Sequence, residues 1–338
     1  MALWTDIITP AELTGYARES LADMELQRGT LAKYLPNRHV LDTAVRFVVG
    51  GSGLVEEARY RAFDAEPEIG RQQGGKRVSI EMPSISQKIP VSEYRQLRAR
   101  NASDAALRDH ILKTTEQVVR AVADRVERTR GVVLATGKAT IAQSNFVMDD
   151  DFGRDPSMAY TAPALFSNAA TDAFGIIQAA VDKYVSMNGV EPGIMLTSKR
   201  VISALGANKS MATILNGGAT RPATVTDLQA TFVGNGLPGF EVYSRRTYSG
   251  AVLPDDRILF LPAPADPNSG ESELGATFWG ETLTGLDAGY AIESSETPGI
   301  VAGVYRNDKP PLIAEVIADS ISLPVLANAN LSLSLKVL

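Results

Sequence analysis

The chain has 338 residues, of which 44% are apolar and 21% charged, an ordinary composition for a globular protein of about two domains. It contains no cysteine, which excludes disulfides, thiolate nucleophiles and metal sites built on cysteine. Its formal net charge of −6 argues against a dedicated nucleic-acid binder, since such proteins are usually basic. Neither a run of about 18 apolar residues nor a signal peptide is visible, so we expect no membrane partner and synthesis in a cytoplasm.

Residues 1–40 have the features of an arm. Thr9 is a candidate N-cap, Pro10 suits the first helical position, and Glu12 completes a capping box. This pattern predicts a helix from Pro10 to Gln27. The apolar stripe of the helix is loose, so we expect it to need a neighbour.

Residues 41–92 differ in character from the arm. Apolar and charged residues alternate at 59–63 and again at 76–82, which predicts strands around a hydrophilic tip from Gly70 to Gly75. These strands carry too few apolar residues for a core of their own, and an isolated hairpin is only marginally stable in water. A long polar hairpin therefore indicates an element that lies on something else.

Residues 104–136 carry the strongest local signal, a stripe of apolar residues at helical spacing. Acid–base pairs four residues apart occupy the other side, in the order that favours an exposed helix face. A helix of this length is about 50 Å long, more than a compact domain usually needs, so we expect a spine with one wet side. The stripe consists of Leu107, Ile111, Val118, Val122, Val126 and Val133.

The rest of the chain predicts an acidic loop, two helices and a series of strands. The loop covers 149–167, the helices run from Asn168 to Met187 and from Lys199 to Leu205, and a strand at Gly193–Leu196 lies between them. From Leu228 onward we expect strands and turns alone. The candidate strands are Phe240–Ser244, Arg257–Leu261, Ala276–Gly280, Ile300–Tyr305, Leu312–Ala318 and Leu331–Leu338.

Two glycine-rich segments resemble nucleotide-binding motifs and fail the tests for them. Residues 234–239 match GxGxxG, but Pro238-Gly239 is a turn followed by a strand, whereas the motif needs a strand before it and a helix after it. We expect a hairpin turn there. Residues 131–138 resemble a phosphate loop but have one residue too many between the glycines, and Ala139 replaces the required hydroxyl.

The titratable residues point to no reaction centre either. Asp149, Asp150, Asp151 and Asp155 lack the ligand spacing of a calcium loop, so a solvated acidic loop is favoured over a metal site. His39 and His110 lie far apart in the sequence, which excludes a multi-histidine metal site. We therefore expect no catalytic, cofactor-binding or metal-binding residues and no enzyme activity.

The order of elements is specific: a helical arm, a charged hairpin, a long spine helix, an α/β part and terminal strands. With the segments YRAFDAEPEIG, LPDDRILFLPAPADPNSGESELGATFWG and PPLIAEVIADSISLPVLANANLSLSLKVL, the chain resembles the lambda-type major capsid proteins of tailed bacteriophages over nearly its whole length. The resemblance implies an α+β chain with the Hong Kong 97-type capsid fold. Its parts would be the N-terminal arm at 1–40, the extended β-hairpin loop at 41–92, the peripheral domain with the spine helix at 93–159, the axial domain at 160–300, and C-terminal strands at 301–338 that return to the peripheral domain.

The same resemblance implies a function in assembly. The chain would form pentamers and hexamers that close an icosahedral head shell around double-stranded DNA, in a virion whose parts are made in the host cytoplasm. Its partners would be further copies of itself, portal and scaffolding proteins, a decoration protein, and packaged DNA bound without sequence specificity, with no cofactor and no membrane. The hairpin charges would contact neighbouring subunits: Arg59, Arg61, Glu66, Glu68, Arg71, Lys76, Arg77 and Glu81.

Three alternatives remain open on the sequence. A crosslink through Lys76, of the kind by which some relatives join their subunits, is less favoured than other reinforcement. The shell could instead be that of an encapsulin-like compartment or a gene transfer agent, although encapsulins are generally shorter. A soluble α/β enzyme is the distant alternative, and only the GxGxxG match favours it.

Overall fold

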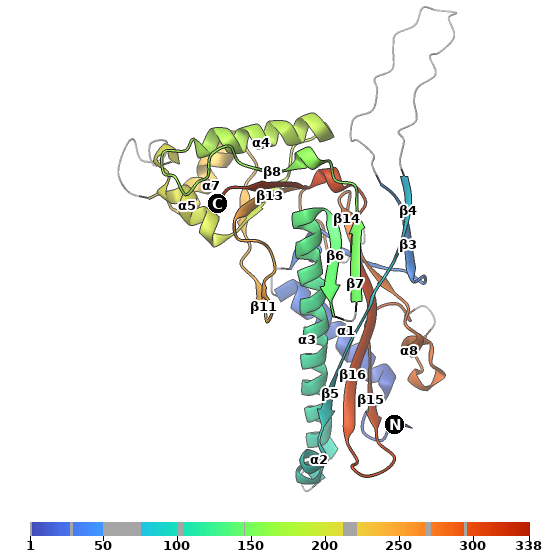
Figure 1. Ribbon diagram of the computed structural model, residues 1–338. Coiled ribbons are helices and arrows are strands. Elements are labelled where there is room, and N and C mark those ends of the chain that lie inside the picture. The colour runs from blue at the N-terminus through green and yellow to red at the C-terminus, as the bar shows by residue number, and fades with distance from the viewer. Residues whose placement is uncertain are drawn as a thin grey trace, which may run out of the picture.

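Two β-sheets and one long helix dominate the structure (Figure 1). The computed structural model describes residues 2–27, 30–49, 76–100, 104–144, 146–211, 222–267, 272–293 and 296–338. The helix lies along the larger sheet, and the smaller sheet with its own helices sits beyond one end of it. Helices and strands both contribute to the core, which confirms the α+β expectation.

The larger sheet has six strands and is built around one long strand, β16 (Ala314–Leu326). Both edges of β16 are paired, and side chains alternate between buried and half-buried along its first half, as expected for a sheet with one covered face. The other strands are β1 (Ala2–Leu3), β2 (Asn37–His39), β5 (Ser84–Val91), β14 (Gly275–Gly280) and β15 (Val301–Arg306).

Helix α3 (Asp104–Thr136) covers one face of this sheet and matches the predicted spine. Val118, Val122 and Val126 are buried against β15 and β16, which confirms the apolar stripe. Arg120, on the opposite side of the helix, is exposed. The wet side follows from the sequence, because every third or fourth residue returns to the same face of a helix.

The burial of this stripe gives a first prediction. Val122→Ala removes two methyl groups from a fully enclosed site and should lower the free energy of unfolding by about 1–3 kcal/mol. Gln117→Ala, on the exposed side of the same helix, is the matched control and should change stability by less than about 0.5 kcal/mol. Urea unfolding followed by circular dichroism measures both. Equal effects of the two changes would show that the stripe is misassigned.

Helix α1 (Pro10–Gln27) has the predicted bounds, and its N-cap is confirmed because Thr9 Oγ1 accepts a hydrogen bond from the Glu12 amide at 3.3 Å. The carboxylate of Glu12 pairs with Arg108 on α3. Leu13 and Ala17 are fully buried in the core of the larger sheet. The neighbour that this helix needs is therefore the larger sheet and α3 of the same chain.

The smaller sheet has five strands in the order β10-β9-β13-β17-β8. Three helices pack on it, and Tyr184, Phe232 and Leu259 are buried in the cluster they share with its strands. The strands are β8 (Ala159–Thr161), β9 (Ile194–Thr197), β10 (Phe240–Val242), β13 (Arg257–Leu261) and β17 (Leu333–Lys336). The helices are α4 (Ala173–Asn188), α5 (Lys199–Ala207) and α7 (Val225–Gly234).

Three antiparallel ladders lie outside the two sheets, and short helices connect the larger elements. The ladders join β3 (Ala44–Val49) to β4 (Lys76–Glu81), β6 (Lys138–Gln143) to β7 (Phe146–Asp151), and β11 (Arg246–Thr247) to β12 (Gly250–Ala251). The short helices are α2 (Glu93–Arg100), α8 (Leu283–Leu286), and the 3₁₀ turns at Leu31–Lys33, Pro156–Met158, Ala288–Tyr290 and Ala329–Leu331.

The expectation of strands and turns alone after Leu228 is wrong, because α7 runs to Gly234. A capping box between Thr224 and Asp227 starts this helix, and both of its hydrogen bonds are formed. The GxGxxG segment therefore follows a helix and precedes a strand, β10, instead of forming a hairpin turn. This is the reverse of the order that a dinucleotide site requires.

The expected acidic loop at 149–167 is also wrong at two places, because residues 149–151 and 159–161 lie on strands β7 and β8. Asp149, Asp150 and Asp151 lie on strand β7, where they pair with β6. Lys138 pairs with Asp151 at 2.8 Å, and Thr140 donates to Asp149 at 2.8 Å, so cross-strand contacts compensate the run of acids. The following helix begins later than predicted, at Ala173, because Asp172 caps it through the Gly175 amide.

The expectation that all of residues 301–338 return to the side of the spine helix is wrong for β17. That strand pairs with β13 and β8 in the smaller sheet, whereas β15 and β16 lie in the larger one. A single 3₁₀ turn capped by Asn328 carries the chain from one sheet to the other. Alternating leucines indicate a strand but do not say which sheet it joins.

Gly131 and Gly137, which gave the resemblance to a phosphate loop, have structural roles at the end of α3. A Cβ at Gly131 would lie 2.3 Å from the carbonyl oxygen of Val252, so only glycine lets that segment approach the helix. Gly137 follows the helix with φ of +74°, the left-handed conformation in which glycine ends helices. Neither glycine faces a phosphate site.

Candidate functional site

The β3–β4 ladder belongs to neither of the two sheets and lies beside the larger one (Figure 1). Its base is anchored, because Val45, Ile80 and Met82 are buried and the Met82 amide donates to the Thr43 carbonyl at 2.9 Å. Beyond this base, the ladder continues as far as the pair Val49–Lys76. The described part of the hairpin therefore has a firm attachment to the core.

Eight charged residues of this segment were predicted to make contacts between subunits, and the structure describes three of them. Lys76 and Arg77 lie in the outer half of β4, and Glu81 is exposed at the base of the hairpin. Glu81 has no ion-pair partner within the described part of the chain. The role of the eight in subunit contacts stays a prediction. The other five, Arg59, Arg61, Glu66, Glu68 and Arg71, lie outside the described residues.

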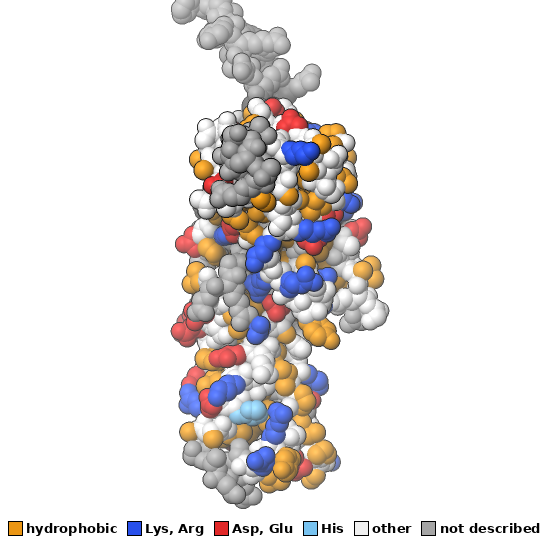
Figure 2. Space-filling model, turned by 90° about the vertical axis from the view of Figure 1, so that its left-hand side faces the viewer, with side chains coloured by type: hydrophobic (Ala, Val, Ile, Leu, Met, Phe, Trp, Pro, Cys, Tyr) orange, Lys and Arg blue, Asp and Glu red, His pale blue; other side chains and the backbone are white. Residues whose placement is uncertain are grey.

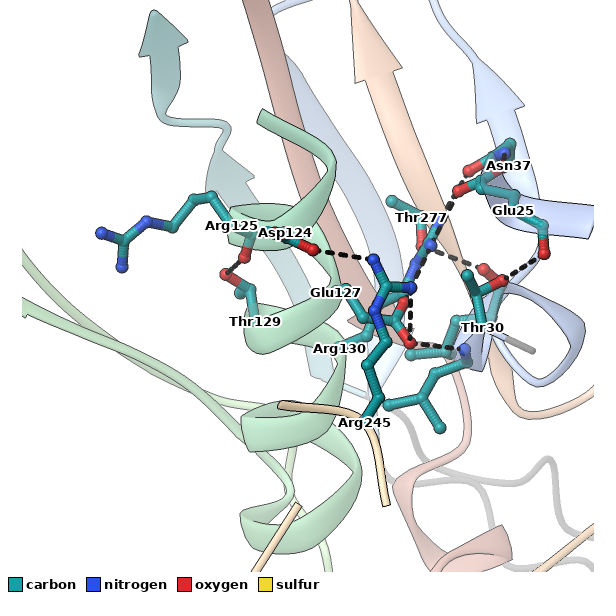
Figure 3. A network of polar contacts seen from close by, with 12 residues as sticks. Glu25, Thr30, Asn37, Asp124, Arg125, Glu127, Thr129, Arg130, Arg245 and Thr277 are labelled. Atoms are coloured by element: carbon teal, nitrogen blue, oxygen red, sulfur yellow. Dashed lines mark hydrogen bonds and ion pairs between the residues drawn. The ribbon is translucent and has the colours of Figure 1, made fainter. Parts of the chain in front are cut away.

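A buried network of charged side chains lies where the arm, the spine helix and the larger sheet meet (Figure 3). At its centre is Arg130 of α3, which is 1% exposed. Its Nη1 lies 2.8 Å from Glu25 Oε1 and 3.3 Å from Glu127 Oε2. Nη2 donates to Asn37 Oδ1 at 2.6 Å, and Nε donates to Thr277 Oγ1 at 2.8 Å. Every nitrogen of the guanidinium group is therefore used.

The second half of the network runs from Glu127 toward the smaller sheet. Glu127 Oε1 accepts hydrogen bonds from the Leu31 amide at 2.8 Å and from the Tyr243 hydroxyl at 2.5 Å. Burial and the neighbouring Glu127 carboxylate raise the pKa of Tyr243, which keeps its hydroxyl protonated as a donor. Arg245, two residues later, donates to Asp124 at 2.8 Å.

A further ion pair connects the segment after the arm to the smaller sheet. Lys33 Nζ lies 2.5 Å from Glu241 on β10, and the Tyr34 hydroxyl donates to the same carboxylate at 3.0 Å. Together with the contacts of Glu127, this pair ties α1, α3 and both sheets into one body. Most polar groups of the network have partners, although Arg245 Nη1 is buried without a hydrogen-bond partner among the described residues. We expect such a network to favour this arrangement of the two sheets.

The sequence analysis missed this network, although one signal was present. Arg130 follows Val122 and Val126 at spacings of four, so it falls on the apolar stripe of the spine helix. A charge on a buried stripe indicates a buried ion pair, since an unpaired buried charge is very costly. The partner Glu127 lies three residues earlier on the same helix.

The two histidines lie on different elements, His39 on β2 and His110 on α3. His39 borders a cavity of about 430 Å³ that Arg18 and Glu25 also line. Partial desolvation at the cavity wall and the nearby Arg18 lower the pKa of His39. Nε2 of His110 is buried without a hydrogen-bond partner among the described residues. The described part of the chain holds no cluster of three or more possible metal ligands.

Comparison with known proteins gives one family and a consistent set of folds. The family model described as "Phage major capsid protein E" matches residues 10–277. No curated protein sequence gives a significant match.

Solved structures match nearly the whole chain at low sequence identity. A phage-related protein from Bordetella bronchiseptica RB50 superposes with a TM-score of 0.62 at 13% identity, covering 96% of this chain and 95% of that one. The putative capsid protein of a prophage from E. coli CFT073 gives 0.58 at 16% identity, with 94% and 98% covered. The capsid of a native GTA particle gives 0.52 at 12% identity, with 91% and 89% covered. At these identities the likeness shows the fold.

Proposed function

The chain belongs to the phage major capsid protein E family, and from this premise we propose how its parts act in a head shell. It is a capsid protein with the Hong Kong 97-type fold, a component of the virion that assembles with many copies of itself. The proposal is that the shell is icosahedral, that pentamers and hexamers of this one chain form it, and that it encloses double-stranded DNA. Heterologous contacts that curve consistently would close it.

We assign the two sheets to the two domains of the capsid fold. The larger sheet with α1 and α3 would be the peripheral domain, and the smaller sheet with α4, α5 and α7 the axial domain around the five-fold and six-fold axes. The separation of the two sheets along the molecule supports this division (Figure 1). The predicted bounds of the axial domain, 160–300, include β14, which pairs with β16 in the larger sheet. The proposal therefore assigns β14 to the peripheral part and β17 to the axial part.

The proposal rests on the β3–β4 ladder, which is anchored to the core but belongs to neither sheet, on a chain of this family. We assign the eight charged residues of the hairpin segment to contacts with neighbouring subunits, where a polar rim suits them. An exposed ion pair contributes under about 1 kcal/mol. A closed shell repeats such contacts around each subunit, so small contributions accumulate.

The remaining partners belong to the same proposal. A portal protein, a scaffolding protein and a decoration protein would meet the shell during or after assembly, which would take place in the host cytoplasm. Among the described helices, none combines the length and apolar character needed to cross a bilayer. Sedimentation of the purified protein, co-expressed with its scaffolding protein, tests the proposal. Shells containing nuclease-protected DNA are expected, whereas shells that hold only a cargo protein would favour an encapsulin-like compartment.

A structural role without enzyme activity gives a second prediction. The double variant His39→Gln, His110→Gln should assemble with unchanged yield and change the free energy of unfolding by less than about 1 kcal/mol, because neither imidazole has a role in chemistry. Gln replaces the His39 ring with a neutral polar group. Particle yield by sedimentation and stability by urea unfolding measure the outcome. A folded variant that fails to assemble would show that a histidine takes part in the shell.

A further inference from the structure

One face of the protein carries exposed arginines although the whole chain is acidic, with a net charge of −6. The arginines lie on the outer side of α3 and on the neighbouring β11–β12 hairpin: Arg120, Arg125 and Arg246 are exposed, and Arg128 is half-buried. Figure 2 views the molecule from this side and shows Lys and Arg side chains gathered at mid-height. We call these four residues the arginine face.

The acids near the arginine face already have partners. Asp124 pairs with Arg245, and Asp109 pairs with Lys113. Glu116, one turn before Arg120, accepts from the neutral Tyr16 hydroxyl and keeps its negative charge. Arg120 and Arg246 have no ion-pair or hydrogen-bond partner in the described part of the chain. Their positive charge is therefore available to a ligand.

Arg125 and Arg128 contact only neutral groups within the described ranges. With the amide of Gln143 turned so that its oxygen faces the guanidinium, the two nitrogens of Arg125 lie 2.8 and 3.1 Å from it. Arg128 donates to the Ala251 carbonyl at 3.5 Å. Figure 3 shows Arg125 pointing away from the buried network, on the other side of α3. A neutral partner orients an arginine without cancelling its charge.

A groove of about 480 Å³ runs between α3, the edge strand β5 and the tip of the β11–β12 hairpin. Arg125 and Arg128 line it together with hydroxyl groups of Ser86, Thr247 and Ser249. Asp124 also lines it, and its carboxylate is paired with Arg245. Tyr248 at the hairpin tip is fully exposed beside it. Guanidinium and hydroxyl donors of this kind bind phosphate oxygens.

The spacing of these arginines favours an extended polyanion over a small phosphorylated molecule. Arg120 and Arg128 are two helical turns apart, which corresponds to about 12 Å along α3. Phosphates along one DNA strand repeat at about 3.4 Å, so a duplex laid on the helix offers phosphates to both. The groove is not an enclosed cavity, whereas most small ligands are largely buried in a pocket.

We propose that the arginine face lies on the inside of the shell and binds the phosphate backbone of packaged double-stranded DNA without reading its sequence. The inference rests on the proposed function, since it names the part of the shell subunit that meets the DNA. Each subunit would make only a few phosphate contacts and bind weakly. A closed shell repeats the face on every subunit, so the whole lining holds the DNA through many weak contacts.

The test uses unassembled full-length subunits and a short duplex of random sequence, with binding followed by fluorescence anisotropy across a salt series. The triple variant Arg120→Gln, Arg125→Gln, Arg246→Gln should bind at least about tenfold more weakly at low salt. Its slope of log affinity against log salt should be smaller by about 3, since each lost phosphate contact removes about 0.9. The control is a second triple variant that removes the same charge from exposed residues of other elements. It carries Arg38→Gln, Arg95→Gln and Lys309→Gln.

Several outcomes would overturn the inference. A triple variant that binds DNA like the unchanged protein, or a control that loses as much, would show that the arginine face is not the site. Tighter binding of an acidic peptide than of DNA would assign the face to a protein partner. If closed shells bind added duplex with the same affinity as free subunits, the arginine face lies on the outside of the shell. Circular dichroism confirms the fold, and shell formation is scored separately, so failure of this inference leaves the assembly proposal standing.

Discussion

Replacing Arg130 by methionine should lower the free energy of unfolding by about 3–5 kcal/mol, the range for removing one partner of a buried ion pair. Methionine fills much of the volume of the arginine side chain. It leaves the buried carboxylate of Glu25 without its cation, and Glu127 keeps only Arg245, whose Nη1 lies 3.8 Å from Glu127 Oε1. Asn37 and Thr277 also lose a hydrogen-bond partner. Urea unfolding followed by circular dichroism measures the loss.

Two further variants separate the charge effect from packing. Arg246→Met, at an exposed site, should change stability by less than about 0.5 kcal/mol. Adding Glu25→Gln and Glu127→Gln to Arg130→Met should recover part of the loss, because the buried negative charges are then gone. An effect of Arg130→Met below about 1 kcal/mol would mean that the network contributes little to holding the two sheets together.

Deleting residues 70–75 should leave the fold of the subunit intact and abolish closure of the shell. These residues lie outside the described ranges, and the expectation follows from their polar, glycine-rich sequence, which offers almost nothing to a core. The anchored base of the hairpin is untouched. Circular dichroism of the subunit and sedimentation of the particle are measured on the same preparation, and at least about a tenfold loss of closed shells is expected, because each subunit engages several neighbours at once.

A matched control replaces the same six residues with a glycine–serine segment of equal length. This variant keeps the span of the hairpin and should form more shells than the deletion. Unfolding of the subunit by the deletion would place the segment in an internal core. Unchanged yield and stability of shells would show that the segment makes no contact needed for assembly. Either result would remove the main role assigned to the hairpin.

The sequence predicts the two longest helices with their bounds. For α1 the cap at Thr9 and the proline after it define the start, and for α3 the valine stripe defines the buried face. These features are local, so a reader of the sequence can recognise them without the rest of the fold. The order of elements then led to the correct fold, although every structural relative reported above has at most 16% identity.

The features that were not predicted from the sequence depend on contacts or on misleading local signals. Helix α7 was missed because a Gly-Asn-Gly segment next to it resembles a turn, although the capping box of Thr224 and Asp227 was visible. The acids of β7 read as a loop because Lys138 and Thr140, which compensate them, lie on the partner strand. The network around Arg130 joins residues more than a hundred positions apart, and sequence spacing does not show such contacts.

The contacts predicted for the hairpin charges depend on molecules outside the chain. Glu81 is exposed at the base, and its expected partner is a residue of another copy. A single subunit shows where the hairpin is anchored but not what it covers. The sequence could therefore indicate that the hairpin lies on something else, and only an assembled particle can identify that surface.

An electron cryomicroscopy reconstruction of the assembled particle tests the central claim most directly. We expect a closed icosahedral shell with the sheet that contains β13 and β17 gathered around the five-fold and six-fold axes. We also expect that the β3–β4 hairpin of each subunit lies across its neighbour. A protein that stays monomeric in the presence of its scaffolding protein, or a shell in which the hairpin folds back on its own subunit, would contradict the claim.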